Sequence, residues 1–217
     1  MRYLAITFCF AFLLSCNSSD KKTSETQAKD STLVSASSTT ASAPKTQMPD
    51  SAEMMKNWKA YMTPGKEHQM MKSWDGTWIG EATMMMPGTP VTKNMVTVVN
   101  KMTMGGRYQL TSQKGSFNGM PFEGMGTLGF DNSKKEFVLS WIDNMGSGII
   151  KMEGPWNETT KSMDLRGAQV DPATGKEMDI RETFRVIDND RQVMEMYGPG
   201  PDGKEIKTMQ IIYTRKK

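Results

Sequence analysis

Apolar and polar side chains alternate with a period of two residues from about residue 76 to the end of the chain. The segment 177–187 shows the pattern most clearly. Its apolar positions are Met178, Ile180, Phe184 and Val186, and its charged positions are Glu177, Asp179, Arg181 and Arg185. A period of two places the two sets on opposite faces of a β-strand. We therefore expect strands with one buried face and one solvated face, as is typical of antiparallel sheets.

About ten such segments follow one another, separated by turn-forming stretches such as "FDNSKK", "DPATGK" and "GPGPDGK". Consecutive hairpins with one apolar face predict an all-β, antiparallel sheet closed into a barrel. Two segments with helical spacing precede the strands, at 50–62 and 63–74, with Asp50 and Thr63 as N-caps. They predict a short N-terminal helical cap, and we expect its second helix to lie over the open end of the barrel.

The first predicted strand begins with Gly-x-Trp at 76–78, and the last one ends with Arg215 on its inward row. A guanidinium over an indole contributes about 0.5–2 kcal/mol. This arrangement resembles the lipocalins and their calycin relatives, in which the Trp closes one end of the barrel and a basic residue lies across its ring. The resemblance implies a calycin-like barrel with Trp78 and Arg215 as a structural pair at its end.

A second resemblance covers nearly all of residues 51–217. The blocks "PGKEHQMM", "GTWIGE", "GGRY", "GMPFEGMGTLGFDN", "WIDNMGSG", "DPATGK" and "YGPGPDGKEIKTMQIIYTRK" occur in the order and spacing of the bacterial family called domain of unknown function 1579. The family implies the same type of barrel. It implies no reaction, substrate or catalytic residue.

The N-terminus predicts export and lipidation. Residues 1–15 have a basic start and a short apolar run, as in a secretory signal peptide, and "LLSC" resembles the lipobox of bacterial lipoproteins. We expect Cys16 to carry the lipid and residues 16–50 to be a disordered tether, since 17–50 contain eight Ser, six Thr and no aromatic residue. These features predict a protein anchored in the cell envelope, periplasmic or surface-facing, with the outer membrane favoured because Asn17 is not Asp. The alternative is an ordinary signal peptide that contains a cysteine.

Inward polar residues of the barrel are the candidate ligand-binding groups. Glu182 interrupts the apolar row of 177–187, Arg107 and Tyr108 open another strand, and Trp141 lies on the inward row of 136–143. Such groups either pair with one another structurally or face the polar end of a ligand. The sequence therefore leaves three functions open: a module that binds a small apolar or amphipathic molecule, a structural or interaction lipoprotein with a filled barrel, or an uncharacterised enzyme.

Other functions find little support in the residues. The charge is nearly balanced, with 27 Lys and Arg against 24 Asp and Glu, so nucleic acid is not an expected partner. His68 is the only histidine, both cysteines lie in the first 16 residues, and no catalytic triad has a sequence context. We expect no enzyme activity, no cofactor and no metal site. The 22 methionines leave Cu(I) binding through thioethers, for example at Met84 and Met86, as an alternative to core packing.

Overall fold

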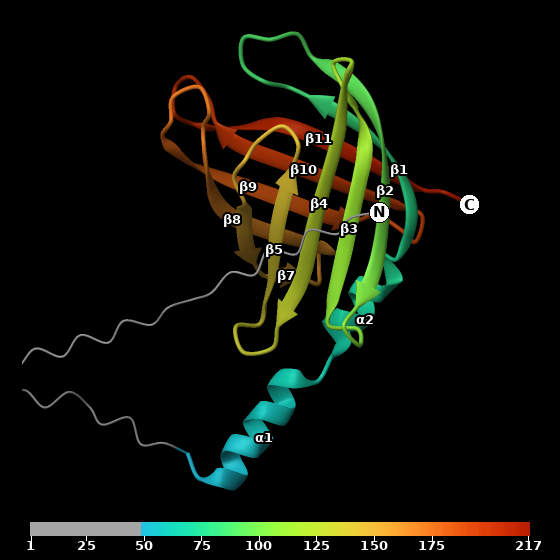
Figure 1. The fold of residues 1–217 in the computed structure, drawn as a ribbon, viewed down its shortest axis with the longest axis vertical. Coiled ribbons are helices and arrows are strands. Elements are labelled where there is room, and N and C mark those ends of the chain that lie inside the picture. Colours follow the sequence, from blue (N-terminus) through green and yellow to red (C-terminus); the bar gives the residue numbers. More distant parts are fainter. Residues whose placement is uncertain (1–48) are drawn as a thin grey trace, which may run out of the picture. The chain divides into compact units, whose positions relative to one another are not determined.

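A computed structural model describes residues 49–217, and these residues form a β-barrel preceded by two helices (Figure 1). The predicted lipobox and most of the predicted tether lie outside the described residues. The wall of the barrel consists of ten strands. They are β1 (Gly76–Met84), β2 (Thr92–Thr103), β3 (Tyr108–Phe117), β4 (Met120–Asp131), β5 (Glu136–Asp143), β6 (Ile150–Gly154), β8 (Ser162–Val170), β9 (Glu177–Val186), β10 (Arg191–Pro199) and β11 (Glu205–Arg215).

Strand pairing closes this sheet on itself. The strand order is β6-β5-β4-β3-β2-β1-β11-β10-β9-β8, and β6 also pairs with β8 through residues such as Met152 and Gly167. Each of these pairings is antiparallel, and a two-residue strand, β7 (Trp156–Asn157), adds to β8 alone. The predicted fold class, an all-β antiparallel barrel of about ten strands behind short N-terminal helices, is confirmed.

The first helix, α1 (Ser51–Met62), begins at the predicted N-cap, where the Asp50 side chain accepts a hydrogen bond from the Glu53 N–H at 2.8 Å. All of its residues are exposed, including Trp58. Two side chains of the barrel hold its C-terminal end: Asn132 donates to three backbone carbonyls between residues 60 and 63, and Arg107 donates to the Met62 carbonyl. None of the helices in residues 49–217 is long and apolar enough to cross a membrane.

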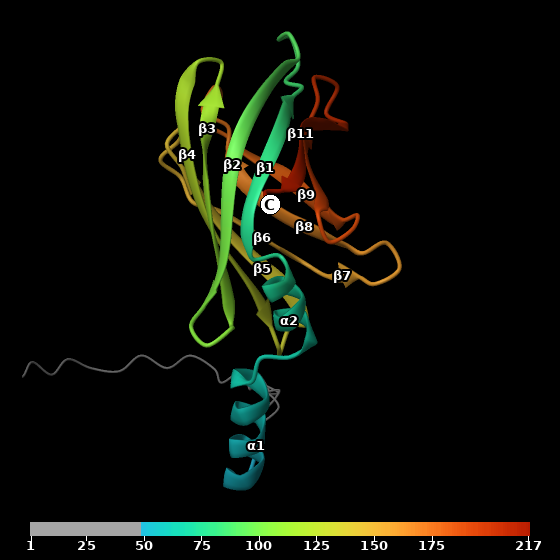
Figure 2. The same cartoon turned by 90° about the vertical axis from the view of Figure 1, so that its right-hand side faces the viewer.

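The second helix, α2 (Lys66–Ser73), closes one end of the barrel (Figure 2). It begins two residues later than the Thr63 cap predicts, because Gly65 occupies the N-cap position. Met71 and the adjoining Trp74 are almost fully buried and pack in one cluster with Phe137, Met152 and Leu165. The helix is therefore part of the base of the barrel. The expectation that it covers the open end is wrong, because the helix packs against the core at the closed end of the barrel.

Candidate ligand-binding site

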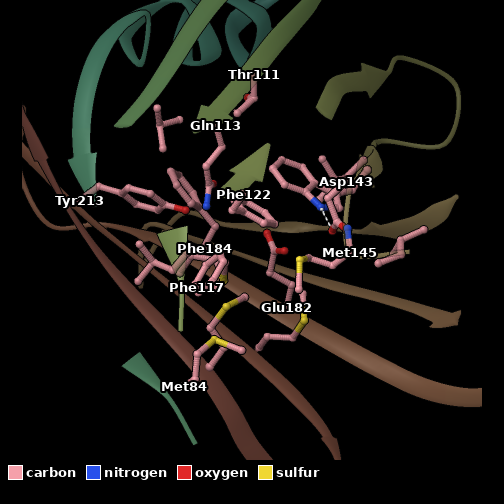
Figure 3. Close-up of a pocket in the computed structure, with 18 of the residues that line it drawn as sticks. Met84, Thr111, Gln113, Phe117, Phe122, Asp143, Met145, Glu182, Phe184 and Tyr213 are labelled. Atoms are coloured by element: carbon pink, nitrogen blue, oxygen red, sulfur yellow. Dashed lines mark hydrogen bonds between the residues drawn. The ribbon is translucent and has the colours of Figure 1, made fainter. Parts of the chain in front are cut away.

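A cavity of about 660 Å³ lies inside the barrel (Figure 3). At the base it reaches Trp74 and Trp78, while Thr89, Asn118 and Met145 from the β1–β2, β3–β4 and β5–β6 connections line the other end. Those connections lie at the end of the barrel opposite α2 (Figure 2). The cavity is thus bounded by the helix below and by three loops above.

The lining is mainly apolar. It includes nine methionines: Met84, Met86, Met120, Met145, Met152, Met163, Met194, Met196 and Met209. Aromatic residues line it as well: Trp74, Trp78, Phe117, Phe122, Trp141, Phe184 and Tyr213. Methionine is unbranched and polarizable, so it adapts to ligands of irregular shape as readily as to neighbouring side chains. Met84 and Met86, which were named above as possible Cu(I) ligands, both belong to this lining.

Glu182 is the most unusual group in this lining. Its cross-strand neighbours are Leu165 on β8 and Met196 on β10, and residues directly opposite each other share a face of the sheet. The residue is partly buried and lines the cavity, and its burial raises the pKa of the Glu182 carboxyl group to about 7. In Figure 3 the carboxyl group points into the pocket. No side chain or backbone group in residues 49–217 donates a hydrogen bond to it, so its partner must come from solvent or a ligand.

Several neutral polar side chains line the same cavity, and three of them are Gln113, Gln192 and Tyr213. Gln192 and Tyr213 are directly opposite each other on β10 and β11, and Gln113 projects from β3. Gln113 and Gln192 are buried, and burial together with the Glu182 charge raises the pKa of Tyr213. Within the described residues, none of the three side chains hydrogen-bonds to another protein group. The cavity therefore offers several unsatisfied polar groups against an apolar background.

Trp141 lies on the inner wall where the sequence places it, and two glycines make room for it. A Cβ atom at Gly124 would lie 2.3 Å from Cζ2 of the indole, and one at Gly126 would lie 2.9 Å from Cε3. The indole Nε1 donates to the Asp143 carboxylate at 2.9 Å. The glycines of β4 thus allow the Trp141 ring to lie flat against the wall and present its other face to the cavity.

The structure brings Trp78 and Arg215 together at the base. They are paired across β1 and β11, and the guanidinium carbon of Arg215 lies 4.1 Å from the centroid of the Trp78 ring. Arg215 also donates to the backbone carbonyls of Ser73, Asp75 and Asn189. Gly76 has φ of +125°, and a Cβ atom there would lie 3.0 Å from Nη1 of Arg215. The pair therefore joins α2, the start of β1 and the β9–β10 turn.

Arg107 and Tyr108 do not line the barrel cavity, so their assignment as ligand-binding residues of the interior is wrong. Arg107 is exposed and donates to the Met62 and Met104 carbonyls, and Tyr108 covers Gly129 on the outer wall. Arg107 lies in the turn before β3, and β3 begins with Tyr108 facing outward, so that Gln109 is the first residue to face inward. Both residues line a separate outer depression of about 440 Å³.

His68 also lines this outer depression. It is buried, and its Nδ1 accepts a hydrogen bond from the Gly65 N–H at 2.9 Å. Burial lowers the pKa of His68; the nearby Glu67 carboxylate opposes this effect, and the Arg107 guanidinium adds to it. A neutral histidine that caps its own helix explains this residue. Within residues 49–217 no three His, Cys, Asp or Glu side chains are grouped as metal ligands.

The alternation pattern predicts Glu182 and Trp141 in the lining, but Gln113, Gln192 and Tyr213 were not predicted as ligand-binding residues. Tyr213 lies two residues before Arg215 on the inward row of the last strand, so the alternation along that strand could have identified it. The two glutamines could not be identified in this way, because polar residues at inward positions look like a solvated face until the pairing of the strands is known.

Comparisons with known proteins agree with the fold. No curated protein matches the chain in a sequence comparison. The crystal structure of Rv2717c from M. tuberculosis is similar at 16% identity with a TM-score of 0.56, covering 71% of this chain and 100% of that chain. A redesigned β-barrel matches at 11% identity over 68% of this chain and 95% of that chain, but its TM-score of 0.35 is too low to indicate a common fold. The likeness to Rv2717c concerns the fold alone. The family described as "Protein of unknown function (DUF1579)" matches residues 63–215, and the chain belongs to that family.

Proposed function

We propose that this protein binds a small apolar or amphipathic molecule inside its barrel. The observation that carries the proposal is the cavity of about 660 Å³ with an apolar lining and a few unsatisfied polar groups. Pockets for small molecules typically have volumes of about 300–1,000 Å³ and combine these same two kinds of surface. The ligand would enter between the loops opposite α2.

We also propose that Cys16 anchors the protein in the cell envelope, with the outer membrane as the favoured site. The support is the lipobox-like "LLSC" and the Ser- and Thr-rich segment that follows it. A flexible coil of this length spans about 30 Å, which would keep the barrel near the membrane surface. Replacing Cys16 by Ala should abolish acyl labelling and release the protein from membranes. An unlabelled wild-type protein that stays in the membrane fraction would contradict the anchor.

The binding proposal can be tested with dodecan-1-ol, a neutral amphiphile, in thermal unfolding of the purified protein. A ligand present at a hundred times its dissociation constant stabilises the fold by about 2.7 kcal/mol. Met209→Trp places a large ring in the cavity and should abolish this stabilisation. Ile212→Trp is the matched control, since Ile212 is exposed on the same strand, and this variant should respond like the wild type.

The alternative function is a structural or interaction lipoprotein whose barrel holds no ligand. It predicts that dodecan-1-ol leaves the unfolding temperature unchanged in all three proteins. A shift that survives Met209→Trp would place binding on the outer surface and would also contradict the proposal.

A further inference from the structure

The charged groups of the cavity are all acidic. Among the lining residues in the described part of the chain there are two carboxylates, Asp143 and Glu182, and no Lys, Arg or His. Asp143 is already engaged, because its oxygens accept hydrogen bonds from the Trp141 indole and the Met145 N–H, each at 2.9 Å. Glu182 is therefore the carboxyl group that faces the cavity without a protein donor.

An ionised carboxylate in an apolar cavity is costly unless a positive or hydrogen-bond-donating group pairs with it. The groups beside Glu182 on its neighbouring strands are Leu165 and Met196, which cannot do so. An anionic ligand would add a further negative charge to the same apolar space. An ammonium group would remove the cost, since it supplies both the opposite charge and the donors.

The remaining lining suits a cation with an apolar body. Aromatic faces attract ammonium groups, and the thioether side chains accommodate alkyl or aromatic groups of varied shape. A row of paired residues, the methionine row, crosses four neighbouring strands from β9 to β1. It runs from Glu182 through Met196 and Met209 to Met84. This row leads from the carboxyl group to the end of β1, next to the loops that border the opening.

We propose that the ligand of this barrel is an apolar molecule with a single basic amine, which binds with its ammonium group at Glu182 and its apolar part along the methionine row. The inference rests on the proposed function and names its ligand class. Tyr213, which also lines the cavity and has no hydrogen-bond partner among the described residues, offers a further oxygen acceptor near Glu182.

Three probes of equal chain length test this assignment: dodecylamine, dodecan-1-ol and dodecanoate. Their dissociation constants are measured at pH 8 with the purified protein by isothermal titration calorimetry. Two carboxamide variants are compared with the wild type. Glu182→Gln removes the cavity carboxylate with little change in shape, and Glu123→Gln removes an exposed one on the outer face of β4.

We expect the wild type to bind dodecylamine at least about tenfold more tightly than dodecan-1-ol, and dodecanoate most weakly, because only the amine pairs with the buried charge. Glu182→Gln should abolish the preference for the amine while leaving dodecan-1-ol affinity within about twofold. Glu123→Gln should keep the wild-type order. Equal affinities for amine and alcohol in the wild type, or a preference that survives Glu182→Gln, would overturn the amine assignment and leave the binding function intact. Failure of all three probes to bind would overturn both.

Discussion

Replacing Glu182 by Gln should stabilise the unliganded protein at neutral and alkaline pH. Folding places this carboxyl group in an apolar environment, which raises its pKa from 4.5 to about 7. The folded state therefore holds the proton more tightly than the unfolded chain. The stability contributed by this group is fully present below pH 4.5, declines as the pH rises towards 7, and stays low above that.

The size of the effect follows from these two pKa values. Each tenfold change in proton affinity corresponds to about 1.4 kcal/mol, so the shift amounts to at most about 3.5 kcal/mol. Water that reaches the carboxylate through the open cavity reduces this cost, and we expect about 1–3 kcal/mol in practice. The amide of Gln is neutral at every pH and avoids the cost.

Urea unfolding of both proteins between pH 4.5 and pH 8 measures this difference. The free energy of unfolding should be nearly equal at pH 4.5, and Glu182→Gln should be the more stable protein at pH 8. Glu123→Gln, on the outer face, should follow the wild type throughout. A Glu182→Gln protein that is less stable than the wild type at pH 8 would show that the carboxylate has a stabilising partner and would refute the reasoning.

Other predictions concern the base, the wall and the N-terminus. Trp78→Ala should lower the free energy of unfolding by about 3–5 kcal/mol in urea titrations. A double-mutant cycle with Arg215→Ala should give a coupling of at least about 0.5 kcal/mol. Strictly additive effects would mean that the Trp78 and Arg215 side chains do not interact. Gly124→Ala forces a Cβ atom into the Trp141 indole, so it should lower the free energy of unfolding by about 1–3 kcal/mol and change the tryptophan fluorescence. An unchanged emission spectrum would contradict the contact between Gly124 and the indole. Chelators should leave the melting temperature unchanged, because we expect no structural metal; a chelator-dependent melt would contradict this.

Much of the fold could be predicted because the inward rows of most strands are apolar. The segment 177–187 gives β9 almost to the residue, and the pairing of Trp78 with Arg215 follows from their places at the start of the first strand and the end of the last. These features depend on local periodicity and on closure of the sheet, which the sequence expresses directly. The position of α2 could not be predicted, because an apolar helix face fits a lid and a buried base equally well.

The candidate site was harder to predict because β3 reverses the usual pattern. Its inward residues include Gln109 and Gln113, while Tyr108 and Leu110 face outward and are exposed. A cavity tolerates polar groups on the inner wall, so the hydrophobic pattern does not give the phase of this strand. The assignment of Arg107 failed for a different reason, since this residue lies in the turn before β3 and not on the strand.

Methionine methyl resonances offer the most direct test of a ligand site inside the barrel. The protein is labelled with ¹³C at its methionine methyl groups, and spectra are recorded while dodecan-1-ol is added. Our account predicts that Met194, Met196 and Met209 of the cavity shift together and saturate, while Met95 and Met125, exposed on the outer wall, stay unchanged. Unchanged cavity resonances, or shifts confined to the exposed methionines, would contradict a binding site within the barrel.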